Sequence, residues 1–133
     1  MKYLILLIIV GLLGCKESDL KMRLKQANEV SIHFYYNSQS DSVIKIVHTN
    51  SKLAIGKLAD FIDRKEVSNK FCGHDGDIVF IKNNKVIDTV YFNALQKSCR
   101  QFYFTINGRI ASTTVSNEAA DFLTSLWAGN SKY

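Results

Sequence analysis

The 133-residue sequence contains no proline, no low-complexity segment and no internal repeat. Nothing after about residue 28 therefore marks a linker or a boundary between two folded domains. The remainder has about the length of one domain, and its content of Ile, Val, Phe and Tyr is sufficient for a hydrophobic core. We expect a single folded domain over residues 29–133.

A long apolar run is also missing. Residues 3–13 are apolar, but a membrane-spanning helix needs roughly 20 such residues. The run follows Lys2 and precedes Gly14 and Cys15, an arrangement typical of a signal peptide. Residues 1–14 are therefore predicted to be a processing segment outside the fold. The alternative is a buried first helix that happens to contain a cysteine.

The end of this segment, Leu12, Leu13, Gly14 and Cys15, resembles the lipobox of bacterial lipoproteins. In that family the cysteine is acylated and the signal peptide is cut just before it. The resemblance implies that Cys15 attaches the chain to a lipid bilayer in the bacterial cell envelope. Lys16, which stands where an aspartate would favour inner-membrane retention, implies delivery to the outer membrane. Several acyl chains anchor firmly, because each buried methylene contributes about 0.8 kcal/mol.

Positive charge is present but dispersed. The formal charge is +5, and removal of Lys2 with the signal peptide leaves +4. No basic stripe with aromatic partners is seen, and an envelope location also argues against nucleic acid as a partner. Residues 15–28 are predicted to be the lipidated cysteine and a tether. This tether has an excess of basic residues that would favour anionic headgroups, but we expect mainly a solvated linker, with at most a helical turn or two around Leu20 and Leu24.

Only three cysteines are present. If Cys15 is acylated, Cys72 and Cys99 remain as an even pair in the oxidising compartment that the resemblance implies. We predict a disulfide between them, which closes a loop of about 27 residues and contributes about 3 to 4 kcal/mol to stability. The alternative is two free buried thiols.

Catalytic and phosphate-binding sequence motifs are absent. The densest polar segment is FCGHDGD, residues 71–77, with Cys72, His74, Asp75 and Asp77. Zinc sites usually pair Cys or His at short spacing and repeat the pair elsewhere, and an oxidised Cys72 is neither a ligand nor a nucleophile. The segment is therefore predicted to be a turn before a strand, with no metal and no cofactor. The alternative is a metal-dependent or thiol enzyme that uses residues 72–77.

Hydrophobic periodicity predicts the secondary structure. Strands with β-branched and aromatic residues are expected at residues 29–36, 42–48, 77–82, 85–92, 99–106 and 109–115. The pairs Asn83-Asn84 and Asn107-Gly108 predict two-residue hairpin turns. Helical spacing predicts one helix after Asn50 or Ser51, and a second that Ser116 caps and Gly129 ends. Their buried faces are expected to be Ile55, Leu58, Ala59 and Ile62, and Ala119, Phe122, Leu123, Leu126 and Trp127.

The order ββ-α-ββ-ββ-α predicts an α+β fold, an antiparallel sheet of about six strands with two helices packed on one face. Strand alternation places Tyr91 and Tyr103 on the face opposite Phe92 and Phe104. We therefore expect an aromatic patch on the open sheet face, although half-buried sheet residues would show the same pattern.

These observations favour a non-enzymatic binding module that is anchored to the envelope and binds a protein, in the manner of inhibitor or immunity lipoproteins. The candidate contact residues are His74 and Asp75 at the turn, with Tyr91 and Tyr103 on the sheet. A purely structural envelope protein is the second alternative, besides the enzyme.

Overall fold

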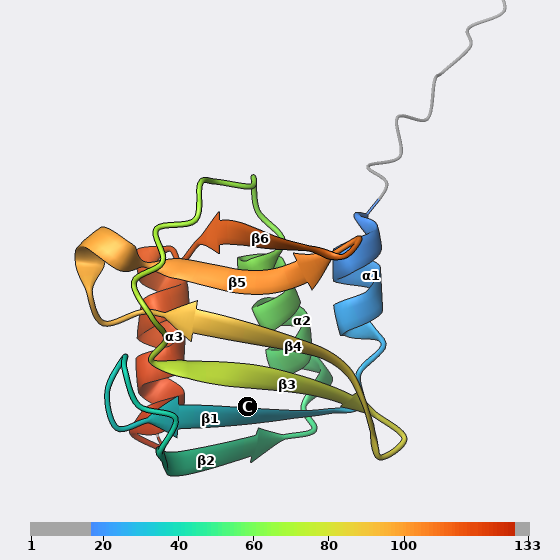
Figure 1. The fold of residues 1–133 in the computed structure, drawn as a ribbon. Helices are drawn as coiled ribbons and strands as arrows, with labels where there is room; N and C mark the ends of the chain where they lie inside the picture. Colours follow the sequence, from blue (N-terminus) through green and yellow to red (C-terminus); the bar gives the residue numbers. More distant parts are fainter. Residues whose placement is uncertain (1–16, 130–133) are drawn as a thin grey trace, which may run out of the picture.

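The computed structural model describes residues 17–129. Its fold is α+β, as predicted: a six-stranded sheet in the order β2-β1-β3-β4-β5-β6, with every neighbouring pair antiparallel (Figure 1). The elements along the chain are α1 (Asp19–Lys25), β1 (Glu29–Tyr35), β2 (Val43–Thr49), α2 (Lys52–Ile62), β3 (Gly76–Lys82), β4 (Lys85–Asn93), the short 3₁₀ helix η1 (Lys97–Cys99), β5 (Gln101–Ile106), β6 (Arg109–Thr114) and α3 (Asn117–Trp127).

Both predicted hairpin turns are confirmed. Asn83 and Asn84 between β3 and β4 have φ values of 50° and 65°, and Asn107 and Gly108 between β5 and β6 have 49° and 77°. Two consecutive residues at positive φ give the backbone twist that matches the strands of a tight hairpin. These turns fix the register, and hence the face of each strand side chain.

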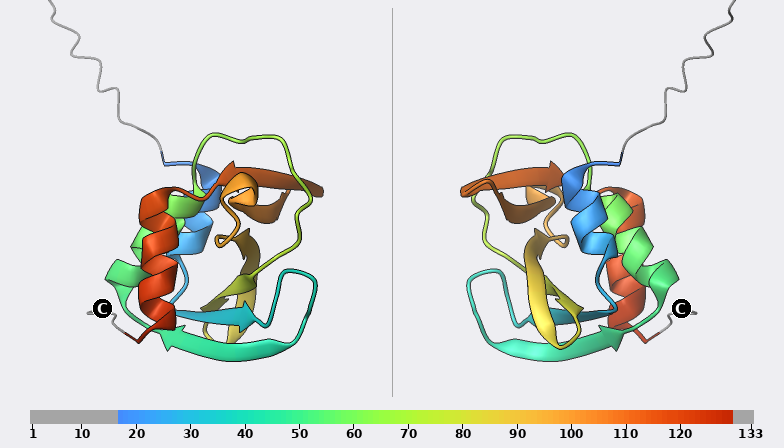
Figure 2. Two further views of the ribbon diagram at one scale, coloured as in Figure 1. Left: turned by 90° about the vertical axis from the view of Figure 1, so that its left-hand side faces the viewer. Right: turned by 90° about the vertical axis from the view of Figure 1, so that its right-hand side faces the viewer.

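The three helices pack on one face of the curved sheet (Figure 2). The side chains of Ser51 and Ser116 accept hydrogen bonds from the backbone N–H groups of Ala54 and Ala119, and so cap α2 and α3 as predicted. The core lies between the helices and the sheet face that carries Val30, Ile32, Phe34, Ile78, Phe80, Val90, Phe92 and Phe102. The opposite sheet face points away from the helices.

Helix α1 corrects the expectation for the tether. Ser18 caps it, and its Leu20 and Leu24 are only 5% and 0% exposed in the core. Arg23 also donates from Nε to Asp88 on β4 at 2.8 Å. Residues 19–25 are thus packed against the domain rather than solvated, because two leucines four positions apart give even a short helix one apolar face.

The residues that predicted lipidation, Cys15 and the segment before it, lie outside the described part of the chain. Within residues 17–129 no helix has both the length and the apolar character needed to cross a bilayer.

Candidate functional site

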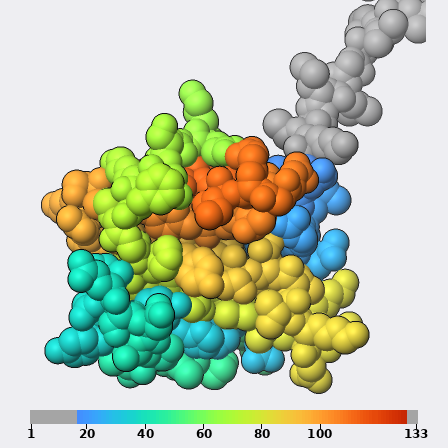
Figure 3. All heavy atoms as spheres, in the orientation of Figure 1, coloured from blue at the N-terminus to red at the C-terminus, as the bar shows by residue number. Residues whose placement is uncertain are grey.

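A long connection between α2 and β3 crosses the open sheet face. We call residues 63–75 the crossing loop; it passes over β5 and β6 on the side away from the helices (Figures 1 and 3). The backbone N–H of Val67 donates to the carbonyl of Ser112 at 2.8 Å. Gln101 holds the next turn, because its Oε1 accepts from the N–H of Lys70 at 3.0 Å and its Nε2 donates to the carbonyl of Ser68 at 2.6 Å. The open face is therefore partly covered.

A disulfide fastens the loop farther along. The sulfur atoms of Cys72 and Cys99 lie 2.02 Å apart and the Cα atoms 5.8 Å apart, so the structure brings together the pair that the sequence predicted. Cys99 ends η1, and only Arg100 separates it from the start of β5. The bond therefore ties the crossing loop, two residues before His74, to the segment that leads into β5.

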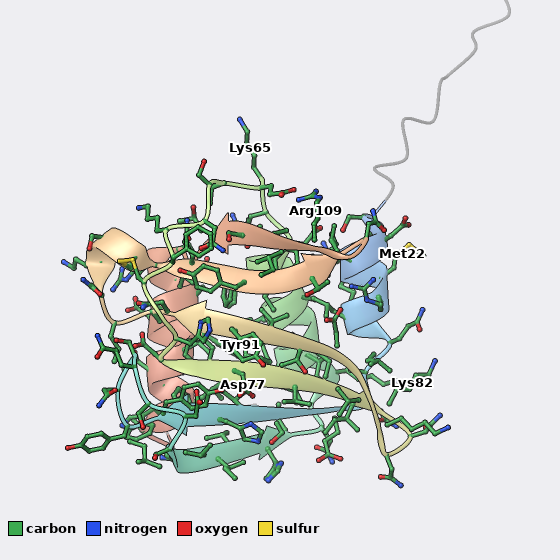
Figure 4. The ribbon with its side chains drawn as sticks, viewed as in Figure 1. Met22, Lys65, Asp77, Lys82, Tyr91 and Arg109 are labelled. Atoms are coloured by element: carbon green, nitrogen blue, oxygen red, sulfur yellow. A yellow bond between two sulfur atoms is a disulfide. The ribbon has the colours of Figure 1, made fainter. Side chains whose placement is uncertain are left out.

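Three of the four predicted contact residues meet under this loop. Tyr91 and Tyr103 face each other across β4 and β5, and the His74 ring lies 4.7 Å and 5.5 Å from their ring centroids. Tyr91 lies on the open face (Figure 4) and is 39% exposed, whereas the loop reduces the exposure of Tyr103 to 5%. His74 Nδ1 is buried and has no hydrogen-bond partner among the described residues. A polar ring atom therefore stands within an aromatic cluster.

The cluster forms one wall of a cavity of about 330 Å³. Phe71, His74, Tyr91 and Tyr103 supply aromatic surface, and Thr89, Thr105 and Asn69 supply polar groups. Burial raises the pKa of Tyr103, which keeps its phenol neutral and uncharged in the wall. The cavity is thus a neutral aromatic recess with a polar rim.

Phe71 is the most prominent residue of this site, and the sequence analysis did not single it out. Its side chain is 81% exposed, and its φ of 52° is uncommon for a residue with a side chain. The N–H of Phe71 donates to Asn69 Oδ1 at 2.8 Å, and Cys72 follows it directly. The only sequence signal was a large aromatic residue beside a cysteine, which does not specify exposure.

Asp75 was predicted to be a contact residue at the turn, but the structure places it elsewhere. Its side chain is buried, and Oδ2 accepts hydrogen bonds from the N–H groups of Ala94 at 2.7 Å and Leu95 at 2.8 Å. The carboxylate therefore supports the backbone that follows β4, instead of being presented beside His74 to a partner.

A second polar group lies on the open face of β1 and β3. Ser31 Oγ is 3.1 Å from His33 Nε2, and His33 Nδ1 is 2.8 Å from Asp77 Oδ1. Tyr35 donates its hydroxyl to Asp77 Oδ2. Burial, with the hydrogen bond to Asp77, raises the pKa of Tyr35, so this phenol remains a donor throughout the neutral range.

A hydrogen-bonded series from serine through histidine to aspartate also forms the catalytic triad of serine hydrolases. Here, however, Ser31 is only 5% exposed, and β1 is paired with β2 and β3 on its two sides. Backbone N–H groups next to Ser31 therefore donate within the sheet and are not free to stabilise an oxyanion. We interpret the group as a satisfied polar network that ties the two strands together.

The enzyme alternative based on residues 72–77 lacks supporting geometry. Thiol chemistry needs a free thiolate, but Cys72 is in the disulfide. Across residues 17–129, no three His, Cys, Asp or Glu side chains gather as a metal would require. Asp75 and Asp77 are committed to backbone N–H groups and to the tyrosine and histidine of β1.

Comparisons with protein-family models, curated protein sequences and solved structures find no match. The function of this chain is therefore inferred from its own residues and geometry.

Proposed function

We propose that this chain is a non-enzymatic binding module that holds a protein partner at the bacterial cell envelope, in the manner of an inhibitor or immunity lipoprotein. The observation that supports it is the convergence of Phe71, His74, Tyr91 and Tyr103 on one surface cavity. Aromatic residues around a recess are frequent energetic centres of protein interfaces, where a partner side chain fills the recess and loses water.

The backbone of Phe71 adds to this argument. A left-handed conformation costs a residue with a Cβ atom roughly 1 to 2 kcal/mol, and glycine almost nothing. An aromatic ring that is 81% exposed gains little packing to offset that cost. Strained residues of this kind concentrate at functional sites. The phenylalanine is therefore better explained by binding than by folding.

A photo-crosslinking amino acid at Ile110, which lines the cavity, tests the proposal in cells that carry the full chain in their envelope. We expect a discrete protein adduct, and we expect Phe71→Gly to reduce it at least tenfold because the anchor ring is lost. The free energy of unfolding of this variant should equal that of the wild-type chain or exceed it by about 1 kcal/mol, since the strain at position 71 is relieved.

Val86 provides the control position, because it is 62% exposed but lies at the start of β4, near the β3–β4 turn. Equal adducts from positions 86 and 110, or an adduct that persists in Phe71→Gly, would contradict the assignment of the cavity as the binding surface.

We also propose that Cys15 is acylated and that the chain is held at the outer membrane. Growth with an alkyne-labelled fatty acid should label the full chain, and Cys15→Ser should remove the label and release the protein from the membrane fraction. Retention of the label in Cys15→Ser would reject the anchor while leaving the binding surface to be judged by the crosslinking result.

A further inference from the structure

The two edges of the sheet differ in whether another segment of the chain pairs with them. At the β6 edge, Glu66 bridges to Thr113, the N–H of Val67 donates to Ser112, and Glu66 pairs with Arg109. At the β2 edge, no strand or bridge of the described chain pairs with the outer side of residues 43–49. One edge is thus closed by the crossing loop, and the other is open.

The register shows which backbone groups of β2 are free. The N–H of Tyr35 donates to Asp75 on the β3 side, so odd-numbered residues of β1 bond toward β3 and even-numbered residues toward β2. The β2 partners of those even residues are Lys45, Val47 and Thr49. The backbone N–H and C=O groups of Ile46 and His48 consequently point away from the sheet, whereas Ile44 lies at a register shift between the Phe34–Lys45 and Tyr35–Val43 pairs.

This open edge carries unusually apolar side chains. Val43, Ile44 and Ile46 are 44%, 51% and 51% exposed. Proteins normally protect such an edge with charge, proline or a covering segment. Lys45 is the strand's lysine, and its Nζ is engaged by the carbonyl and the ring of Trp127. The edge is therefore suited to pairing with another strand.

A second cavity opens at the beginning of this edge. It measures about 290 Å³ and lies on the helix side of the sheet, between Phe34, Phe92, Leu123 and Trp127, with Ile44 at its border. Cavities for small molecules run from roughly 300 to 1,000 Å³, so this one is small and suits a single large side chain. Its rim is apolar, and Tyr36 and Leu95 on it are 72% and 77% exposed.

We propose that β2 binds an extended peptide segment of a protein partner as a seventh strand, and that one large apolar side chain of that segment occupies the cavity beside Ile44. The outward backbone groups of Ile46 and His48 supply donors and acceptors along the edge, which only another extended backbone satisfies in full. Ile44 belongs to both the edge and the cavity, so one peptide reaches both. Main-chain pairing then provides affinity and the cavity provides sequence preference.

This site is separate from the cavity under the crossing loop, because it uses the sheet edge and the helix side instead of the open face. A partner that binds both would be held by two independent surfaces. The failure of either proposal leaves the other intact.

The test uses the full chain and a phage-displayed library of random linear peptides. We expect selected peptides to share an alternating apolar pattern with one large apolar residue. When a selected peptide binds, amide hydrogen exchange at Ile46 and His48 should slow at least tenfold, because these amides gain acceptors. Exchange at Lys45, Val47 and Thr49, already bonded to β1, should change little.

Ile46→Pro removes an outward N–H group and should abolish peptide binding while the protein stays folded, since proline is tolerated at edge positions whose N–H faces solvent. Trp127→Ala should weaken binding at least tenfold, whereas Phe71→Gly and Val86→Ala should leave it unchanged. Selection of no peptide, or binding that survives Ile46→Pro, would overturn the proposal. Self-association of the free chain that Ile46→Pro abolishes would overturn it in favour of a second copy as the occupant.

Discussion

Replacement of Gly76 by alanine is expected to lower the free energy of unfolding by about 3 kcal/mol, the upper part of the range for overpacked cores. A Cβ atom at this position would lie 2.1 Å from the carbonyl oxygen of His33 and 2.6 Å from Cζ of Phe92. The carbonyl belongs to the paired backbone of β1, and the Phe92 ring is 1% exposed in the core, so neither yields easily. Urea denaturation of the variant measures the loss.

Gly56 gives a matched control with the opposite expected sign. It lies inside α2, and a Cβ atom there would meet no atom within 4 Å. Gly56→Ala should therefore raise the free energy of unfolding by about 0.5 to 1 kcal/mol, the difference in helix propensity. If both substitutions shifted the free energy of unfolding in the same direction, that result would contradict the close approach of Gly76 to the His33 carbonyl and the Phe92 ring.

Removal of the disulfide is expected to lower the free energy of unfolding by a similar or larger amount than Gly76→Ala. Cys72 and Cys99 are separated by 27 positions, and closure of a loop of this length contributes about 3 to 4 kcal/mol in the chain-entropy model. Small domains are stable by only about 5 to 15 kcal/mol in total. The Cys72→Ala, Cys99→Ala double variant should thus lose a large share of its stability in urea denaturation.

In the same variant, the cavity under the crossing loop should already be altered under conditions in which the domain is still folded. Without the covalent tie, the loop is held by hydrogen bonds: Gln101 bonds to Ser68 and Lys70, the N–H of His74 donates to the carbonyl of Ser38, and Asn93 Nδ2 donates to the carbonyl of Gly73. We expect faster hydrogen exchange at residues 71–74 and a loss of crosslinking from position 110. Reductant should reproduce these effects in the wild-type chain and do nothing to the double variant. Unchanged stability after reduction would contradict a structural disulfide.

The parts of this fold that the sequence predicted are those fixed by neighbouring residues. Asn83-Asn84 and Asn107-Gly108 specify their turns locally, and strand alternation then places Tyr91 and Tyr103 on the open face. The caps Ser51 and Ser116 likewise act within one helical turn. Helix α1 was underestimated because seven residues give a weak periodic signal.

The missed parts depend on contacts between distant residues. Ser31 and His33 share a face of one strand, but their partner Asp77 comes from a strand 44 positions after His33. Gln101 is a polar strand residue, yet it is 2% exposed because the crossing loop bonds to it from 31 and 33 positions away. Asp75 turns inward for backbone groups after β4, which no local pattern indicates.

Helix α1 also sets how the domain would stand on a bilayer. With lipid on Cys15, three residues lie between the anchor and the start of α1, and the four steps from Cys15 to Asp19 reach about 14 Å even when fully extended. The β3–β4 turn lies at the same end of the sheet, where Asn83 bonds to Asn28 and Lys82 extends outward (Figure 4). Lys82 and Lys85 would then face anionic headgroups. The crossing-loop disulfide and η1 lie at the opposite end of the sheet and would in that orientation be directed away from the membrane (Figure 4).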